Sequence, residues 1–251
     1  MERRLLELTY SHKLSHIGSC LTALPIIDRI YRTKGVNDIF ILSSGHAGLA
    51  LYVVLEKYEG RNAKHLLEKH GIHPSRDPEN GIWASSGSLG SAILVAIGYA
   101  LGDKSRDVHV LISDGECAEG SVWEALSFAH RKNLKNLKVH VNINGYSAYD
   151  SVNQWNLFWR LKSFNPDVNV WFTENPTTTF MKGLNAHYVS MSENDKDEML
   201  SMIHEKGFCV TPLRCYEKGF QDFFAYCRSG FWNFGSHTKR LSRQIYERWF
   251  I

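Results

Sequence analysis

The chain has 251 residues, of which 43% are hydrophobic and 22% are charged, and its net charge is +3. This composition is typical of a globular protein that is long enough to bury a sizeable core. The charge is too small to indicate nucleic-acid binding, and no basic stripe interleaved with aromatic residues supports it. The five cysteines are odd in number and form no Cys-x-x-Cys pair, which favours reduced thiols in the cytoplasm over a disulfide framework or a zinc ribbon.

The sequence predicts neither a secretion signal nor a membrane span. Its first residues, MERRLLELTYSHKL, carry charges where a signal peptide needs an apolar segment. The longest uncharged segment, 81–102, begins with Gly and Ser and contains only about ten apolar residues, too few to cross a bilayer. We therefore expect a buried helix there and a cytoplasmic protein.

Residues 1–60 are expected to be largely helical. Apolar residues recur at helical spacing in 24–31 and in 48–60, and Gly60 is a natural helix end. Between these two segments, residues 40–48 form a short apolar run that turns into a Gly-rich corner.

The middle of the chain contains the clearest structural unit. Residues 61–88, rich in Pro, Gly and Ser, are predicted to be loop, and 89–101 to be a helix of small residues. A strand over 107–113, a helix over 120–132 and a strand over 137–144 then form a βαβ unit, so the two strands are parallel. This predicts an α/β fold with a mostly parallel sheet flanked by helices.

Beyond residue 150 the pattern is weaker. Residues 199–207 favour a helix and 207–213 are a candidate strand, whereas the aromatic-rich tail fits no element. We expect one domain over 1–251, with 1–60 as its helical N-terminal part and 151–251 as a divergent C-terminal part.

Polar side chains follow both strands of the βαβ unit. Asp114 comes just after the first strand and Asn144 just after the second, and parallel strands bring both to the same edge of the sheet. With the backbone carbonyl of Tyr146 they form a hard oxygen set that suits Mg²⁺. Gly115 allows a phosphate to approach the backbone, and the helix that begins near Gly120 offers its N-terminus to an anion. The pattern indicates a metal-diphosphate site, although Asp-Gly and Asn-Gly are also common turn dipeptides, and the residues alone leave both interpretations open.

Residues 113–150 resemble the thiamine-diphosphate motif of transketolases, a Gly-Asp-Gly followed at a fixed distance by an Asn. Asp114 and Asn144 are thirty positions apart, and Ser113 replaces the first Gly.

Three more segments resemble transketolase motifs in the same order. They are 11–31 with His16, 37–60 with His46, and IHPS together with 83–102, which contain His73 and Gly87 to Gly90, with Ser88 in place of a Pro. After residue 150 the likeness fades, because the family's Gly-His-Asp turn would fall near 192–195, where its His is missing.

The resemblance implies a role for each matched residue. Asp114, Asn144 and the Tyr146 carbonyl would ligate Mg²⁺. The thiamine diphosphate would be lined by Gly87, Leu89, Gly115, Glu116 and Asn144. His16, His46 and His73 would surround the thiazolium and the sugar hydroxyls as hydrogen-bond donors and general acid/base groups. Glu119 would join a proton relay at a subunit interface, or it would only complement the dipole of the helix that follows.

The resemblance also implies a partner. Full transketolases carry a pyrimidine-binding domain that supplies a catalytic Glu, and this chain resembles the separate N-terminal subunit of a split transketolase. We expect it to transfer a two-carbon ketol unit between sugar phosphates only with a pyrimidine-binding C-terminal subunit, as a heterotetramer.

Three alternatives remain open at this stage. One is another thiamine enzyme subunit, similar to deoxyxylulose-phosphate synthase or to the α subunit of an E1 2-oxo acid dehydrogenase. The second is a non-catalytic regulatory homologue. A free-standing Mg²⁺ hydrolase is the least favoured, because no nucleophile or base stands out near the metal ligands.

Overall fold

The computed structural model describes residues 1–147, 150–175, 178–181, 188–206 and 213–214. Its α-helices are α1 Glu2–Ser11, α2 Ile17–Thr33, α3 Gly48–Glu59, α4 Ala63–His70, α5 Ala92–Gly102, α6 Gly120–Arg131, α7 Gln154–Phe164 and α8 Glu193–Lys206. Its strands are β1 Ile39–Leu42, β2 Val108–Ser113, β3 Leu137–Ile143, β4 Asn169–Phe172 and β5 Leu213–Arg214, and three short 3₁₀ turns are η1 Gly45–Ala47, η2 Pro78–Asn80 and η3 Gly115–Ala118.

The strands form one sheet in the order β1-β2-β3-β4-β5. β1 to β4 are parallel, with Ile39 paired to Val108, Val108 to Leu137, and His140 to Asn169. The predicted βαβ unit is confirmed as β2-α6-β3, and with it the α/β class. β1 and most of β2 and β3 are buried, as expected for parallel strands with helices on both faces, whereas β4 is only partly buried.

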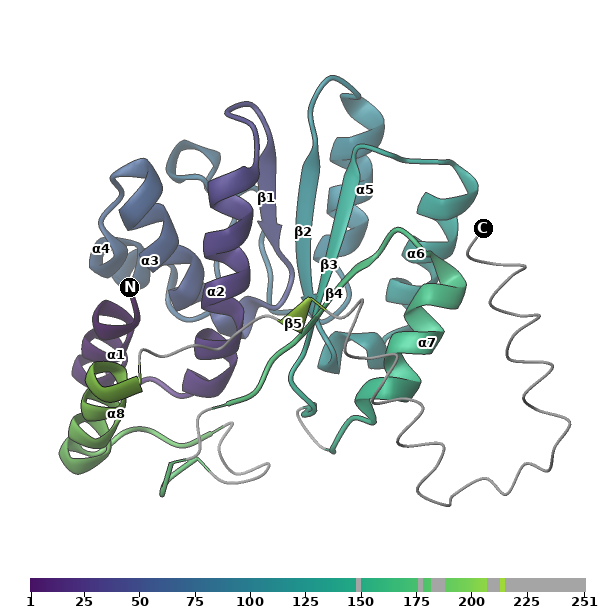
Figure 1. The fold of residues 1–251 in the computed structure, drawn as a ribbon. Helices are drawn as coiled ribbons and strands as arrows, with labels where there is room; N and C mark the ends of the chain where they lie inside the picture. Colours follow the sequence, from purple (N-terminus) through teal and green to yellow (C-terminus); the bar gives the residue numbers. More distant parts are fainter. Residues whose placement is uncertain (148–149, 176–177, 182–187, 207–212, 215–251) are drawn as a thin grey trace, which may run out of the picture. The chain divides into compact units, whose positions relative to one another are not determined.

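The helices cover the two faces of this sheet, with α2 on one face and α5 on the other (Figure 1). Tyr31 of α2 packs on Phe40 of β1, with ring centroids 5.7 Å apart. α5 packs against β1, β2 and β3 and against α6. A continuous core joins α1 to α4 with Phe40 and Leu111 on the α2 side of the sheet.

Several elements differ from the sequence prediction. A helix, α4, lies within 61–88, where only loop was predicted; the Asn62 side chain caps it by accepting from the His65 N–H at 3.0 Å. Residues 1–60 are largely helical, as predicted, but the apolar run within them forms β1 at residues 39–42, which joins the sheet. α7 and β4 were not predicted, whereas the helix expected over 199–207 lies within α8 as far as Lys206.

The chain divides into two compact units, Met1–Leu213 and Arg214–Ile251. The second unit lies outside the described residues except for Arg214, as do the aromatic tail and most of the candidate strand over 207–213. The single-domain expectation therefore stays a prediction. None of the helices among the described residues has the length and apolar character that a bilayer crossing requires.

Candidate functional site

The candidate residues gather at the carboxyl edge of the parallel strands. Ser43 follows β1, Asp114 follows β2, and Asn144 follows β3. Backbone hydrogen bonds continue the sheet pairing past the strands, because the Ser43 N–H donates to the Leu111 carbonyl at 2.9 Å and the Asp114 N–H to the Asn142 carbonyl at 2.9 Å. The loops after neighbouring strands are therefore held side by side.

Asp114 joins two of these loops. Its side chain is 3% exposed, and its Oδ2 accepts from the Asn144 N–H at 2.9 Å and the Gly145 N–H at 2.7 Å. Its Oδ1 accepts from the Gly115 N–H at 3.0 Å. Burial raises the pKa of Asp114 to about 7, although the three backbone N–H groups oppose this shift. Among the described residues no Lys or Arg pairs with this carboxylate, so its charge has no cationic partner.

Asn144 and Tyr146 lie in the loop that Asp114 holds. The Asn144 Oδ1 accepts from the Tyr146 N–H at 3.0 Å, and Tyr146 is 45% exposed. Asp114 and Asn144 thus lie side by side at one edge of the sheet, as the strand arrangement predicted. Carboxylate, amide and carbonyl oxygens are the donor set that Mg²⁺ prefers, and the uncompensated charge of Asp114 fits a bound cation.

The three histidines predicted from separate motifs form one cluster. The ring of His16 lies 5.8 Å from the ring of His46 and 6.3 Å from that of His73, measured between centroids. His16 is the residue before α2 and has a left-handed backbone with φ of 63°. His46 lies in η1, and His73 in the loop after α4.

Two glycines bring the loops of this cluster into close contact. A Cβ on Gly45 would lie 2.5 Å from the Gly87 nitrogen, and a Cβ on Gly87 would lie 2.9 Å from the His73 ring. Gly87 also has φ of +120°, which side chains rarely tolerate. The Gly-rich loop before α5 therefore packs directly against both His46 and His73 segments. Leu89 lies in the same loop and is partly buried.

Glu116 lies beneath this edge and is fully buried. Its Oε1 accepts from the Ser43 Oγ at 2.6 Å and the Gly90 N–H at 3.1 Å, and its Oε2 accepts from the Ser113 N–H at 3.0 Å. Burial is the main cause that raises the pKa of Glu116, against the effect of these three hydrogen bonds. Glu119, in contrast, is exposed at the start of α6 and makes no side-chain cap.

The two departures from the family motif are accommodated locally. Ser113 has no positive φ, so this position does not require Gly, and its Oγ accepts from the Glu116 N–H at 3.4 Å. The Ser88 carbonyl accepts from the Ser91 hydroxyl at 2.7 Å, which closes the turn into α5.

Sequence reasoning missed two residues at this edge. The ring of Tyr188 lies 5.8 Å from that of His16, although 172 positions separate them along the chain. Asn175 follows β4 and packs so closely on Gly18 that a Cβ there would lie 2.9 Å from its Oδ1, a buried oxygen with no hydrogen-bond partner among the described residues. Neither residue belongs to a motif with a fixed spacing, so only the fold reveals them.

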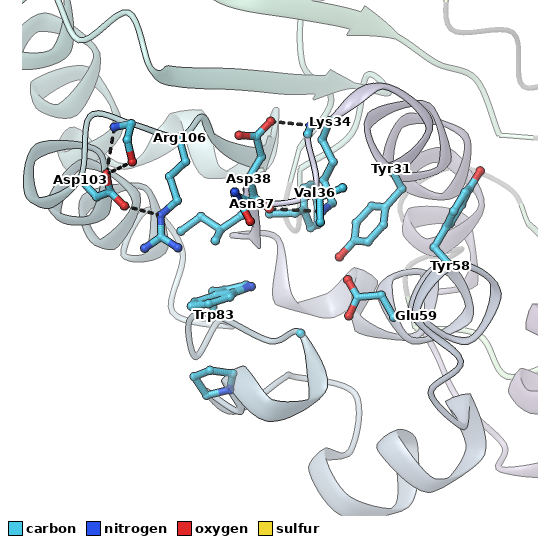
Figure 2. A pocket seen from close by; sticks show the side chains of 16 residues that line it. Tyr31, Lys34, Val36, Asn37, Asp38, Tyr58, Glu59, Trp83, Asp103 and Arg106 are labelled. Carbon is cyan, nitrogen blue, oxygen red and sulfur yellow. Dashed lines mark hydrogen bonds and ion pairs between the residues drawn. The ribbon is translucent and has the colours of Figure 1, made fainter.

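A cavity of about 740 Å³ lies at the opposite, amino edge of the strands. Trp83 and Glu59 extend into it from separate elements (Figure 2). Arg106 and Asp103 in its wall form an ion pair, with Arg106 Nε 3.2 Å from an oxygen of Asp103. No residue of the candidate site lines it, so it is separate from the chemistry at the carboxyl edge.

Asp38, Asp107 and His109 form a cluster near that cavity, with one ligand atom each within 4.8 Å of the others. The Trp171 Nε1–H donates to His140 Nδ1 at 3.1 Å, so neutral His140 carries its proton on Nε2, which lies 3.2 Å from His109 Nδ1. Burial lowers the pKa of both histidines, that of His140 to about 3. Neutral His109 therefore carries its own proton on Nε2 and offers no lone pair to a metal.

The chain is similar in sequence to transketolases. No family model matches the chain. It is 32% identical over 164 residues to an apulose-4-phosphate transketolase subunit of Phocaeicola vulgatus, covering 57% of this chain and 57% of that protein. It is 38% identical over 126 residues to human transketolase, covering 45% of this chain and 20% of that protein.

Solved structures give the same answer for the fold. A transketolase from Leishmania mexicana superposes with a TM-score of 0.61 at 17% identity, covering 91% of this chain and 44% of that one. The chain therefore spans little more than half the length of the Phocaeicola vulgatus protein that it matches, and less of the full-length transketolases.

Proposed function

We propose that this chain, which is similar to transketolases in sequence and in fold, is the diphosphate-binding subunit of a transketolase-like enzyme. In this proposal it binds Mg²⁺-thiamine diphosphate and transfers a two-carbon ketol unit between sugar phosphates. The observation that carries the proposal is the meeting of His16, His46 and His73, which come from three motifs far apart in the sequence.

The cofactor ligands are assigned from the carboxyl edge of the sheet. Asp114, Asn144 and the carbonyl of Tyr146 would hold the Mg²⁺, and the Gly115 backbone would lie along the diphosphate. Gly87 and Leu89 would contact the aminopyrimidine ring. When bound, thiamine diphosphate supplies the carbon nucleophile that accepts the ketol group.

The chain's own residues would bind the sugar and move protons. The three histidines present ring nitrogens from three directions, which suits hydrogen bonds to the hydroxyls and carbonyl of a ketose phosphate. A positioned histidine that transfers a proton contributes about 10²- to 10⁴-fold to the rate. Glu119 is exposed beside the Gly90 loop, and in this proposal it contacts a second subunit as part of the relay.

An exposed apolar face supports the proposal of a partner subunit. Leu94, Val95 and Leu101 are 48%, 41% and 44% exposed on α5, a helix that contains no charged residue. Helices that are apolar on all sides are normally covered on all sides, and α5 begins directly after the Gly87–Gly90 loop. We propose that a pyrimidine-binding subunit covers this face and completes the site, as a heterotetramer in the cytoplasm.

The test is an assay of ketol transfer from ketose phosphates to aldose phosphates, with this chain alone and mixed with a pyrimidine-domain subunit of a split transketolase. Turnover is expected only in the mixture, and His46→Ala should lower kcat/KM by about 10²-fold or more. His65→Ala, on the exposed face of α4, is the matched control and should leave it unchanged. Equal activity of both variants would overturn the role of the histidine cluster.

A non-catalytic regulatory protein is the second candidate. In that case this chain would bind the cofactor or the partner subunit, but the mixture would show no ketol transfer.

A further inference from the structure

Glu116 is a fully buried carboxylate in the middle of the candidate site, and the resemblance to transketolases implied that it contacts the cofactor. Its surroundings point to a different role. Among the described residues no cation forms an ion pair with it, although burying a carboxylate without one is costly. Its contacts explain why it is tolerated.

The three hydrogen bonds to Glu116 come from three separate segments of the chain. Ser43 belongs to the loop that presents His46, Gly90 to the loop that contains Gly87, and Ser113 to the end of β2 just before Asp114. Each of these segments carries a different part of the proposed site.

The Gly90 loop is held from both sides. Its N–H donates to Glu116, and its carbonyl accepts from the Ser121 hydroxyl of α6 at 2.9 Å. A Cβ on Gly90 would lie 2.8 Å from the Cβ of Glu119, so the loop has no room to shift toward α6.

We propose that Glu116 is a positioning residue that fixes the His46, Gly87 and Asp114 segments relative to one another, without touching the cofactor. This inference deepens the proposed function and rests on it for the identity of the ligand. Glu116 is fully buried and already accepts three hydrogen bonds from the protein, as expected of a group that orients its neighbours.

Both side-chain oxygens of Glu116 accept a hydrogen bond from a backbone N–H, so a donor cannot replace either of them. In Glu116→Gln, an amide nitrogen at the Oε1 position would face the Gly90 N–H, and at the Oε2 position it would face the Ser113 N–H. Either orientation leaves one backbone donor unpaired, while the Ser43 hydroxyl can rotate to become an acceptor.

The direct test is amide hydrogen exchange on the cofactor-free chain, comparing wild type with Glu116→Gln. The amide of Gly90 or Ser113 should exchange about tenfold faster or more, while amides in the strand centres such as Val110 keep their protection. Asp28→Asn is the matched control, since Asp28 is a buried acid 6% exposed in α2 that pairs with Lys57. It should leave the Gly90 and Ser113 amides unchanged.

Cofactor titration gives the second readout. In the assembled enzyme, Glu116→Gln should raise the thiamine diphosphate concentration for half-maximal activity about tenfold, and it should also lower kcat at saturating cofactor, because the His46 and Gly87 segments are no longer held in place. Unchanged exchange together with unchanged cofactor affinity would overturn the positioning role. Unchanged exchange with lost affinity would overturn it too and make Glu116 a contact residue.

The exchange experiment needs no cofactor, so it stands even when the proposed function fails. Should Glu116→Gln not fold, Ser43→Ala replaces it, because that variant removes one of the three donors and keeps the carboxylate. Weaker cofactor binding with native strand protection would support the proposal, and wild-type affinity would overturn it.

Discussion

Replacing Asp114 by Asn should reverse the order of stability between variant and wild type when the cofactor is added. The pKa of Asp114, raised from 3.8 to about 7, means that the ionised form destabilises the metal-free fold. The difference corresponds to at most about 4 kcal/mol of unfolding free energy. The stability that protonated Asp114 contributes is fully present below the unfolded-state pKa. It is lost as the pH rises from about 4 to about 7.

Asn is neutral throughout this range, so the variant escapes the loss. It gives up one hydrogen bond to the backbone donors around Asp114, which costs about 1 kcal/mol. Without metal, Asp114→Asn should therefore be less stable than wild type at pH 4 and more stable at pH 8, by about 2 to 3 kcal/mol.

The assay is urea denaturation with EDTA at pH values from 4 to 8, repeated with Mg²⁺ and thiamine diphosphate in the presence of the partner. Saturation at 1,000 times Kd should stabilise wild type by about 4.1 kcal/mol and the variant far less, which puts wild type ahead again at pH 8. Asp107→Asn, just before the same strand, is the control and should show no crossover. A stability difference that does not change with pH would contradict the role of the buried Asp114 charge, and equal stabilisation of both chains by the cofactor would contradict its role as a metal ligand.

Three further outcomes are expected. Gly87→Ala should displace His73 and lower kcat, whereas Gly71→Ala, which has positive φ but no atom within 4 Å of its Cβ, should cost stability only; equal losses of kcat would contradict this. Leu94→Glu should leave the melting temperature of the isolated chain within a few degrees and weaken partner association at least tenfold in analytical ultracentrifugation. Asp77→Asn should lower the unfolding free energy by about 1 kcal/mol at pH 7, because hydrogen bonds from a lysine and an asparagine hold the pKa of Asp77 at about 2. The difference between variant and wild type should shrink as the pH falls from 5 to 2, and a difference that stays constant would contradict this.

The sequence predicted the parts of the site that follow strong local patterns. The run VHVLIS and the run LKVHVNI are apolar enough to be buried strands, and the helix between them has its apolar residues on one face. That unit alone placed Asp114 and Asn144 at one edge. His16, His46 and His73 could be predicted only through motif resemblance, because nothing in their local sequence shows that they meet.

Other features could not be predicted because tertiary contacts decide them. α4 is only eight residues long and largely polar, so its periodicity is weak, and its start depends on the Asn62 cap. β4, with the sequence NVWF, is short and becomes a strand through pairing with β3. The position of Tyr188 beside His16 has no local sequence signal at all.

The enclosure of Glu116 shows a further limit. A Glu three residues after a strand is normally expected to be solvated or to bind a ligand. Here Ser43, Gly90 and Ser113 converge on it from three segments, which only the assembled sheet edge brings together.

The most direct test of the account is calorimetric titration of thiamine diphosphate with Mg²⁺ into this chain, alone and mixed with a pyrimidine-domain subunit. We predict binding that appears or tightens strongly in the mixture, disappears with EDTA and is lost in Asp114→Ala. A mixture that forms a stable complex yet binds no cofactor, or an Asp114→Ala chain that binds it as tightly as wild type, would contradict the assignment of this edge as a thiamine-diphosphate site.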